Sequence, residues 1–241
     1  MTYLQFHAAF TAPVLVALWL LRPRPSPTWR PLLLLVGIAF AYTTPWDNYL
    51  VAREVWTYPP DRVWFEVGYV PIEEYAFFVI QTLMAGLTYR LLRARRFPEP
   101  APRGEVRQRW PGVALFGALS VAGWAMIAVG GHALYLGLIL GWAGPVLTLM
   151  WGVGGELIWA RRRLIGWTVV PLSLYLWVAD RVAIGLGIWD ITDATRTGWE
   201  WVGLPVEEAL FFVVTNLMVA QGLALLEPPL REVMPRLGRA R

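Results

Sequence analysis

Seven long apolar stretches dominate this chain, and they constrain its fold more than any other feature. A helix needs roughly 20 apolar residues to cross the hydrocarbon layer of a bilayer. Stretches of approximately this length cover residues 3–21, 31–50, 71–92, 111–129, 133–160, 164–188 and 205–226. The second is the weakest, because Thr43-Thr44-Pro45 breaks it before Trp46. We therefore predict an all-α integral membrane protein with about seven transmembrane helices, located in the cell membrane as a multi-pass protein.

The composition agrees with this prediction. Of the 241 residues, 57% are hydrophobic and only 16% are charged, an apolar excess too large for an ordinary soluble domain. All 21 basic residues are arginines that cluster beside the apolar stretches, so the net charge of +4 indicates membrane topology and not nucleic-acid binding. The absence of cysteine excludes thiol catalysis, cysteine-bound metals and disulfides. The N-terminus lacks the segments of a signal peptide, so we interpret it as the first span.

The placement of the arginines predicts the orientation of the helices. Seventeen of the 21 follow the first, third, fifth or seventh stretch. The positive-inside rule makes the side on which these residues lie cytoplasmic. The other four, Arg53, Arg62, Arg181 and Arg196, lie in or near loops on the opposite side. We therefore expect the N-terminus outside and the C-terminus in the cytoplasm.

The chain also contains an internal duplication. Residues 71–84 and 205–218 are identical at eight of fourteen positions, and both begin with Pro-x-Glu-Glu. Earlier landmarks recur in the same order and at almost the same separation along the sequence. These landmarks are Pro13 with Pro145, Asp47 with Asp180, and Trp56 with Trp189. Matching landmarks in register across three successive spans indicate a repeat.

We predict two three-helix repeats, at residues 1–96 and 133–241, joined by a linker loop and connector helix at 97–132. The repeats are four spans apart, an even number, so they have the same orientation in the membrane and are parallel. The second repeat ends in a basic cytoplasmic tail. Sites in membrane proteins built from repeats tend to lie where the two units meet.

Acidic residues at the starts of the repeated spans are the candidate catalytic groups. Pro-x-Glu-Glu is also a favourable way to begin any helix, and for one motif alone this simpler interpretation has equal weight. Duplication would copy a helix cap as readily as a catalytic group. The pairing of the glutamates, an aspartate associated with each preceding span and aromatic residues one turn below favour a functional site, since ionisable groups are costly in the membrane. The candidates are Glu73, Glu74, Glu207, Glu208, Asp47 and Asp180. The periodicity does not identify which glutamate of each pair faces the interior.

Aromatic residues lie one helical turn below these glutamates. The aromatic residues that we expect to contact a substrate are Trp46, Trp56, Phe77, Phe78, Trp189, Phe211 and Phe212. A carboxyl group enclosed by apolar side chains can hold a proton at neutral pH, and aromatic faces stabilise a cation without attacking it. This combination suits proton-initiated carbocation chemistry on a hydrocarbon. For most of the other tryptophans, contact with lipid or helix packing is the favoured interpretation.

Several kinds of binding site are unsupported. Neither glycine pair, Gly152-x-Gly154 or Gly185-x-Gly187, has the third glycine of a dinucleotide fingerprint, and no phosphate loop is present. No Asp-Asp-x-x-Asp run exists to hold magnesium and a diphosphate. His7 and His132 are too few and too far apart in sequence to indicate a metal site, and each fits a polar residue at the end of a span. We therefore predict no cofactor and no metal.

Three segments resemble one known family. They are Trp-Asp-Asn-Tyr at 46–49, Gly-Tyr-Val-Pro-Ile-Glu-Glu-Tyr-Ala-Phe-Phe at 68–78 and Leu-Pro-Val-Glu-Glu-Ala-Leu-Phe-Phe at 204–212. Together they resemble the small membrane-embedded lycopene cyclases, which occur as paired subunits in some actinobacteria, as fused chains in archaea and joined to phytoene synthase in fungi. The resemblance covers essentially the whole chain, and both repeats with the connecting helix are similar to the fused form.

The resemblance implies that each linear end of lycopene is closed into a β-ring, giving γ-carotene and then β-carotene without net redox change. It attaches catalytic importance to the four glutamates of the repeated motif, and Asp47 matches the Trp-Asp-Asn-Tyr position. The second half has Ala-Asp-Arg-Val instead, so Asp180 is inferred only through the internal repeat. The implied partners are lycopene or another acyclic carotenoid and membrane lipid, with no nucleic acid. No oligomeric state is predicted.

Two other functions stay open at this point. A related cyclase could act on a longer carotenoid, form ε-rings by losing a different proton, or close another terpenoid. A proton- or cation-coupled transporter also combines paired repeats with membrane acids. Against the transporter, the acids lie at the starts of spans and are followed by aromatic and not polar residues.

Overall fold

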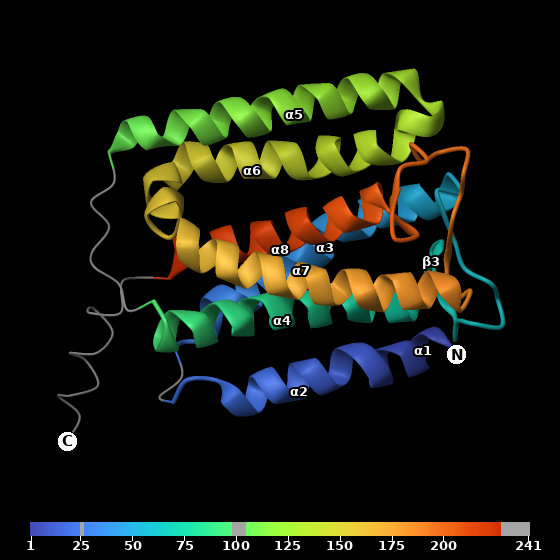
Figure 1. The fold of residues 1–241 in the computed structure, drawn as a ribbon, viewed down its shortest axis with the longest axis horizontal. Coiled ribbons are helices and arrows are strands. Elements are labelled where there is room, and N and C mark those ends of the chain that lie inside the picture. Colours follow the sequence, from blue (N-terminus) through green and yellow to red (C-terminus); the bar gives the residue numbers. More distant parts are fainter. Residues whose placement is uncertain (25–26, 98–104, 228–241) are drawn as a thin grey trace.

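The computed structural model describes residues 1–24, 27–97 and 105–227, so the predicted basic tail and most of the linker loop lie outside the described residues. It is a bundle of long helices with short strand pairs gathered at one end (Figure 1). The helices are α1 (Tyr3–Phe6), α2 (Ala12–Leu21), α3 (Arg30–Ala52), α4 (Ile72–Arg95), α5 (Arg109–Val129), α6 (Leu134–Ala160), α7 (Arg162–Gly185) and α8 (Val206–Leu226). A π-helical turn (His7–Thr11) joins α1 to α2, and short 3-10 turns precede α5 (Val106–Gln108) and α6 (Gly131–Ala133).

Six helical segments in the described part of the chain are long and apolar enough to cross a membrane. They cover Tyr3–Leu21, Ile72–Arg95, Val106–Val129, Gly131–Ala160, Arg162–Gly185 and Val206–Leu226. Six of the seven expected spans are thereby confirmed as long apolar helices. The remaining one, residues 31–50, forms the 23-residue helix α3 but is not among the six.

The predicted break at Thr43-Thr44-Pro45 is wrong, because α3 continues through Pro45 to Ala52. Proline removes one backbone donor, but side chains and neighbouring helices make it tolerable within a membrane helix. Here the Thr44 hydroxyl donates to the Phe40 carbonyl at 2.7 Å, and the Asn48 amide donates to the Thr44 carbonyl at 2.9 Å. Additional hydrogen bonds therefore hold the helix on both sides of the proline.

Each Pro-x-Glu-Glu helix begins directly after a two-stranded hairpin. Strand β2 (Glu66–Val67) pairs with β3 (Val70–Pro71) before α4, and β5 (Glu200–Trp201) pairs with β6 (Leu204–Pro205) before α8. Each hairpin turns over two residues, a geometry that requires positive φ angles. The turns supply these at Gly68 (φ 68°), Val202 (φ 54°) and Gly203 (φ 75°). The proline that ends each hairpin occupies the N-cap position of the following helix. The hairpin therefore sets the direction of the helix whose first turn carries the glutamates.

The two halves of the chain meet in a third strand pair. Strand β1 (Trp56–Thr57) lies antiparallel to β4 (Asp190–Ile191), and Thr57 faces Asp190. These two residues have the same separation along the sequence as the landmarks Asp47 and Asp180. The two loops that occupy equivalent places in the duplicated halves are therefore hydrogen-bonded to each other. The division into repeats at 1–96 and 133–241 remains a prediction, which this pairing supports.

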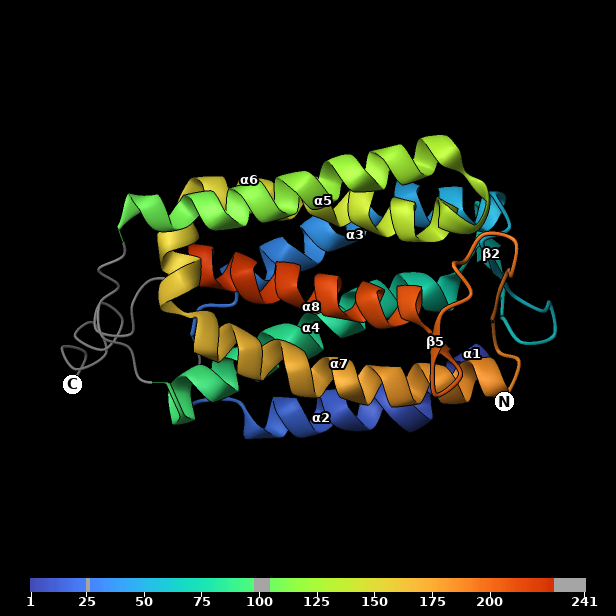
Figure 2. The same cartoon turned by 45° about the horizontal axis from the view of Figure 1, so that its top comes forward.

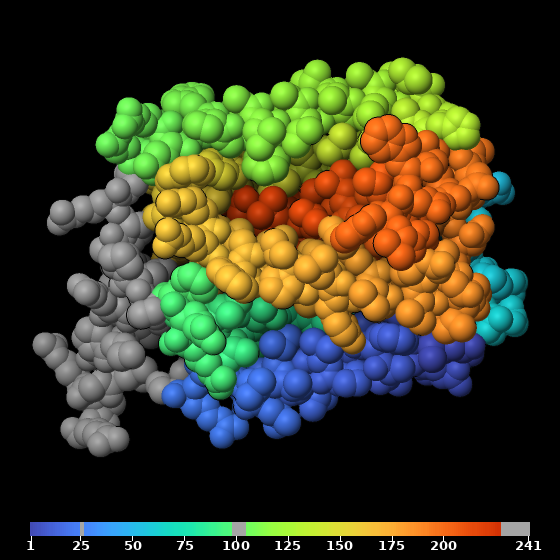
Figure 3. Space-filling view, viewed as in Figure 1, coloured from blue at the N-terminus to red at the C-terminus, as the bar shows by residue number. Residues whose placement is uncertain are grey.

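Helix α8 lies at the centre of the bundle and contacts α3, α4, α6 and α7. On one face only a narrow strip of it is visible between its neighbours (Figure 3). Its buried small residues, Ala220, Gly222 and Ala224, allow close approach of the surrounding helices, as is common between helices in membranes. The core therefore runs along α8, with the repeated glutamates at its beginning.

Helix α5 forms the edge of the bundle and packs antiparallel on α6 (Figure 2). A Cβ atom on Gly123 would lie 2.4 Å from the backbone nitrogen of Gly141, so the two helices touch backbone to backbone. This peripheral position fits the predicted connector. The N-terminus and the C-terminal end of α8 lie at opposite ends of the bundle (Figure 1). The orientation with the N-terminus outside remains a prediction.

Candidate active site

Four buried carboxyl groups gather near the strand-bearing end of the bundle. Asp47 of α3, Glu74 of α4, Asp180 of α7 and Glu208 of α8 are each no more than 5% exposed. Asp47 and Asp180 each interact electrostatically with both glutamates. The structure thus brings together four of the six predicted acids, two from each half of the chain.

Glu74 is held by two tyrosines. The Tyr3 hydroxyl donates to Glu74 Oε2 at 2.5 Å, and the Tyr58 hydroxyl donates to the same oxygen at 3.1 Å. Burial raises the pKa of the Tyr58 hydroxyl well above its usual range, and the negative charge of Glu74 adds to the effect. Tyr58, in the loop after α3, therefore keeps its proton and acts as a donor.

Glu208 has a corresponding pair of donors. The Tyr135 hydroxyl and the Trp56 indole nitrogen both donate to Glu208 Oε1, the latter at 3.0 Å. Tyr3 and Tyr135 have the same separation along the sequence as the landmarks Pro13 and Pro145. Neither tyrosine was predicted, although that separation was a signal that could have identified both.

The first glutamate of each motif has a different position. Glu73 Oε1 accepts the backbone N–H of Trp64 at 2.9 Å, and Glu207 Oε1 accepts the backbone N–H and the hydroxyl of Thr197, both at 2.7 Å. The second oxygen of both glutamates is buried without a hydrogen-bond partner in the described part of the chain. In each pair, therefore, the first glutamate contacts the preceding loop and the second belongs to the acid cluster.

The two aspartates are also unequal. Asp180 Oδ1 accepts the Trp189 indole N–H at 2.9 Å. Neither carboxyl oxygen of Asp47, which is fully buried, has a hydrogen-bond partner among residues 1–24, 27–97 and 105–227. Buried polar groups are nearly always hydrogen-bonded, so a carboxyl group left in this state indicates function more than stability.

A small cavity of about 30 Å³ lies among these groups. Its lining includes Glu74, Asp180 and Glu208 together with the predicted aromatic residues Trp56, Trp189, Phe77, Phe211 and Phe212. Apolar walls and carboxyl groups therefore share one small cavity between the two halves of the chain.

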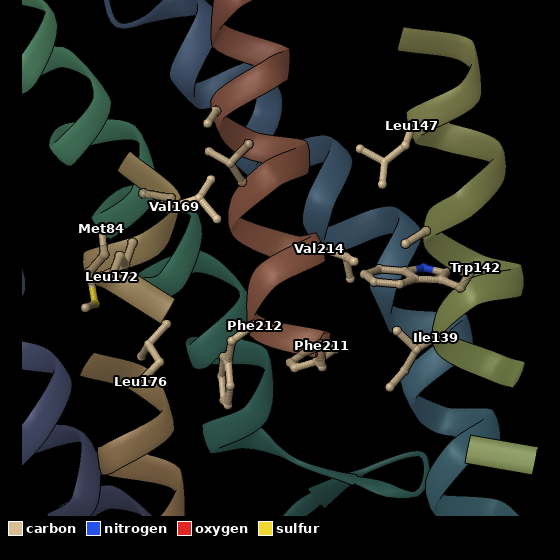
Figure 4. Packing of buried hydrophobic residues seen from close by; sticks show 14 of the residues in the cluster. Met84, Ile139, Trp142, Leu147, Val169, Leu172, Leu176, Phe211, Phe212 and Val214 are labelled. Carbon is tan, nitrogen blue, oxygen red and sulfur yellow. The ribbon is translucent and has the colours of Figure 1, made fainter. Parts of the chain in front are cut away.

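Trp46 and Phe78 lie outside this small cavity. Trp46 donates its indole N–H to the Leu138 carbonyl at 3.1 Å and stacks on Trp142 at a ring distance of 4.5 Å. Trp142 lies across from Phe211, which is in the second turn of α8 (Figure 4). Phe78 packs edge-on against Tyr75 at 5.7 Å. The predicted aromatic set is thus divided between the acid cluster and an adjoining region near α6.

Asn48 of the Trp-Asp-Asn-Tyr segment fixes the first hairpin. Its Oδ1 accepts the Tyr69 backbone N–H at 3.0 Å, and its Nδ2 donates to the Tyr75 hydroxyl at 2.9 Å. A Cβ atom on Gly68 would lie 2.3 Å from the same Oδ1, so the turn fits closely around the amide. Asn48 thereby links α3 to the strand that positions Glu74.

The second half achieves the same link with a different residue. Arg181 follows Asp180 as Asn48 follows Asp47, and it donates from Nε to the Val202 carbonyl at 3.0 Å in the second hairpin. A Cβ atom on Gly203 would lie 2.7 Å from that Nε. The departure from Trp-Asp-Asn-Tyr therefore preserves the connection between helix and hairpin.

The histidines bind backbone carbonyls. His7 is buried near the start of the first span, where Nε2 lies 2.9 Å from the Glu73 carbonyl and the ring stacks on Tyr3. His132 Nδ1 lies 3.0 Å from the Asp193 carbonyl. Both positions agree with polar residues at the ends of spans.

Comparison with known proteins gives relatives over most of the chain. The lycopene β-cyclase of Halobacterium salinarum, in two strains, is 41% identical over 233 residues, which cover 93% of this chain and 95% of that protein. The bifunctional lycopene cyclase/phytoene synthase of Podospora anserina is 39% identical over 209 residues, covering 80% of this chain and 34% of that protein. No family model matches the chain. No solved structure matches it either.

Proposed function

The chain belongs to the lycopene β-cyclase family, and from this premise we propose that it converts lycopene, by way of γ-carotene, to β-carotene within the membrane. It is a carotenoid cyclase, an enzyme that rearranges its substrate without net redox change. The observation that carries the proposal is the buried cluster of Asp47, Glu74, Asp180 and Glu208 in apolar and aromatic surroundings.

The reaction requires one proton to enter and one to leave. A carboxylic acid adds its proton to the terminal double bond of lycopene, which leaves a positive charge on the more substituted carbon. The electrons of an internal double bond attack that carbon, closing the ring by a new carbon–carbon bond and moving the charge to a ring carbon. A carboxylate then removes a proton from the ring, and the electrons of that C–H bond form the ring double bond.

We assign the proton transfers to Glu74 and Glu208, because each lies at the small cavity and is held in place by two donors. A general acid or base must be positioned by its neighbours before its proton affinity matters. Asp47 and Asp180 lie within electrostatic range of both glutamates, so negative charge left on any member of the cluster stabilises the carbocation.

Aromatic side chains supply the rest of the site. Phe77, Phe211 and Phe212 line the cavity, and Trp56 meets Phe211 edge-on at 5.7 Å. Aromatic faces attract a cation but are poor nucleophiles, so they protect the intermediate without capturing it. Apolar walls also disfavour water, which would otherwise add to the cation.

Glu73 and Glu207 are proposed as positioning residues and not as proton donors. Each accepts hydrogen bonds from the loop that leads into its own hairpin. They therefore fix the first turn of the helix that carries the neighbouring catalytic glutamate.

The enzyme is proposed to lie in the cell membrane with its N-terminus outside, its C-terminus cytoplasmic and α3 as a seventh span. Six long apolar helices support membrane insertion. The substrate is an oily polyene, so it reaches the site from the bilayer. The two three-helix repeats each contribute one glutamate and one aspartate to the cluster.

Expression in lycopene-accumulating bacteria tests the proposed function. Chromatography of the extracted pigments should show β-carotene with the wild-type chain and retained lycopene with Glu74→Gln or Glu208→Gln, at equal amounts of protein in the membrane. Glu156→Gln is a suitable control, because Glu156 pairs with Arg109 at the α5–α6 edge. Unchanged lycopene with the wild-type chain contradicts the cyclase assignment, and an ε-ring product contradicts the β-ring outcome.

A further inference from the structure

We propose that the segment of the polyene next to the reacting end lies in a second, larger cavity between α3, α4, α6 and α8, which we name the polyene groove. The inference rests on the proposed function, because it specifies where the remainder of the same substrate binds. The groove has a volume of about 270 Å³ and shares Phe211 with the small acidic cavity.

The small cavity cannot hold a forming ring by itself. Its volume is about 30 Å³, whereas an engineered apolar cavity that binds benzene has about 150 Å³. The reacting end of the substrate therefore needs adjoining space. Phe211 is the lining residue common to both cavities, and it lies one helical turn after Glu208. The geometry points to ring closure at this junction.

The shape of the polyene groove fits a linear chain. Its lining extends over residues 35–43 of α3, 142–150 of α6 and 211–219 of α8. The first and last residues of each segment are eight positions apart, which is about 12 Å along a helix at 1.5 Å per residue. The groove is therefore elongated parallel to the helices, with Phe211 at the end nearer to the acids.

The chemistry of the groove fits a hydrocarbon. Three polar side chains of its wall are engaged with protein groups. Gln81 Nε2 donates to Thr215 Oγ1 at 2.5 Å, and the Thr82 hydroxyl donates to the Phe78 carbonyl at 2.8 Å. Thr215 in turn donates to the Phe211 carbonyl at 2.8 Å. A polar ligand would have to compete for these bonds, whereas a polyene leaves them intact.

The groove also opens toward the lipid. Three of its lining residues, between α3 and α6, are exposed on the flank of the bundle: Ile38 (52%), Tyr42 (39%) and Leu149 (66%). In a bilayer this flank faces acyl chains, so a carotenoid enters sideways without crossing water. The chain extending beyond the groove then remains in the membrane.

Aromatic rings form the inner end of the groove. The Phe211 ring stacks on Trp46 at 5.8 Å and on Trp142 at 6.3 Å, and Trp46 meets Trp56 edge-on at 5.9 Å. Trp56 is the residue that donates to Glu208. A polyene that packs against Phe211 therefore contacts aromatic rings up to the acid cluster.

Two phenylalanine substitutions on one helix test the groove. Ala39 lines it, whereas Ala41, two residues later on α3, is exposed outside it. Ala39→Phe should lower the initial rate of lycopene cyclisation roughly tenfold or more, because the chain can no longer be aligned with the acids, and Ala41→Phe should retain the wild-type rate. Val146→Phe in the groove and Val153→Phe on the exposed face of α6 form a second pair, which decides the question if Ala39→Phe does not accumulate.

Binding gives a readout that is independent of turnover. A polyene held in a chiral site acquires circular dichroism in its visible absorption band. Lycopene added to purified Glu208→Gln protein should show this signal, Ala39→Phe in the same background should remove it, and Ala41→Phe should keep it. If the groove variant and its control have equal cyclisation rates and equal circular dichroism signals, and the wild-type chain forms β-carotene, the groove proposal is wrong and the proposed function stands. Failure of the wild-type chain to cyclise lycopene would instead refute the proposed function.

Discussion

Trp56 donates a hydrogen bond from its indole nitrogen to Glu208 at 3.0 Å, although the two residues lie in different halves of the chain. The bond is formed beside the strand pair in which Thr57 faces Asp190. The candidate acid of one half is therefore completed by a side chain from the other. An active site assembled in this way needs both halves.

Trp56→Phe should distinguish the contribution of the hydrogen bond to Glu208 from that of the aromatic ring. Phenylalanine keeps an aromatic face but donates nothing to Glu208. We expect a fall in kcat of roughly tenfold to a hundredfold, the range for loss of one hydrogen bond to a charged group, with little change in protein level. Turnover of lycopene in membranes and an immunoblot measure the two quantities. Wild-type kcat would show that the Trp56 bond has no part in positioning Glu208.

The two glutamates of each motif should respond differently to glutamine. Glu74→Gln and Glu208→Gln remove a proton donor and should lower turnover by about a hundredfold or more. Glu73→Gln and Glu207→Gln keep an oxygen that accepts the loop N–H, so they should lose less than about tenfold. β-Carotene formation by equal amounts of each variant distinguishes the pairs. A loss for Glu73→Gln as large as for Glu74→Gln would contradict the division of roles.

The link between Asn48 and the first hairpin yields a steric prediction. Gly68→Ala places a Cβ atom 2.3 Å from Asn48 Oδ1 in addition to the strain at φ 68°, whereas Gly187→Ala has a similar φ of 61° with nothing within 4 Å. We expect Gly68→Ala to reduce turnover roughly tenfold further than Gly187→Ala, because it moves the helix that carries Glu74. Equal rates for the two alanine variants would mean that this hairpin does not position the acid.

A buried ion cluster at the other end of the bundle should matter for stability and not for chemistry. Glu227 accepts from Arg90 Nε and from Arg93 Nη1, both at 2.7 Å, with side chains no more than 4% exposed. Glu227→Gln removes the charge that both arginines contact and should cost about 3–5 kcal/mol of stability.

Thermal unfolding in detergent measures this loss. Glu105→Gln, which breaks an exposed ion pair with Arg107, should change stability by less than about 1 kcal/mol. Cyclisation at low temperature should survive in both variants. A Glu227→Gln protein as stable as Glu105→Gln would contradict the structural role of the cluster.

The apolar stretches predicted the main helices, because length is a property of the sequence itself. The repeated motif and its associated aspartates named six acids, of which the structure brings four together. The side of the helix on which Glu74 lies could not be predicted. Both faces of its helix are apolar, so periodicity cannot distinguish the interior from the lipid. The tertiary contacts separate the two residues: Glu74 accepts hydrogen bonds from Tyr3 and Tyr58, whereas Glu73 accepts one from the backbone of Trp64.

The tyrosine donors were missed for a similar reason. Tyr3 and Tyr135 lie in apolar stretches, where a tyrosine is ordinarily interpreted as part of the core. Their matching places in the two repeats were the available signal. Comparison of the repeats could not identify Asn48 and Arg181 as equivalent, because different side chains make corresponding contacts to the two hairpins. The continuation of α3 through Pro45 was missed because Thr43-Thr44-Pro45 was interpreted as a break, whereas the Thr44 hydroxyl donates to the Phe40 carbonyl within the helix.

Deuterium incorporation tests the proton transfer from Glu74 and Glu208 most directly. The purified enzyme is equilibrated in D₂O, mixed with less than one equivalent of lycopene, and the product is analysed by mass spectrometry and NMR. We expect one deuterium per ring, on the carbon that was the less substituted end of the terminal double bond, and no product with Glu74→Gln or Glu208→Gln. β-Carotene formed at the normal rate without deuterium at that carbon would contradict acid-initiated ring closure by these carboxyl groups.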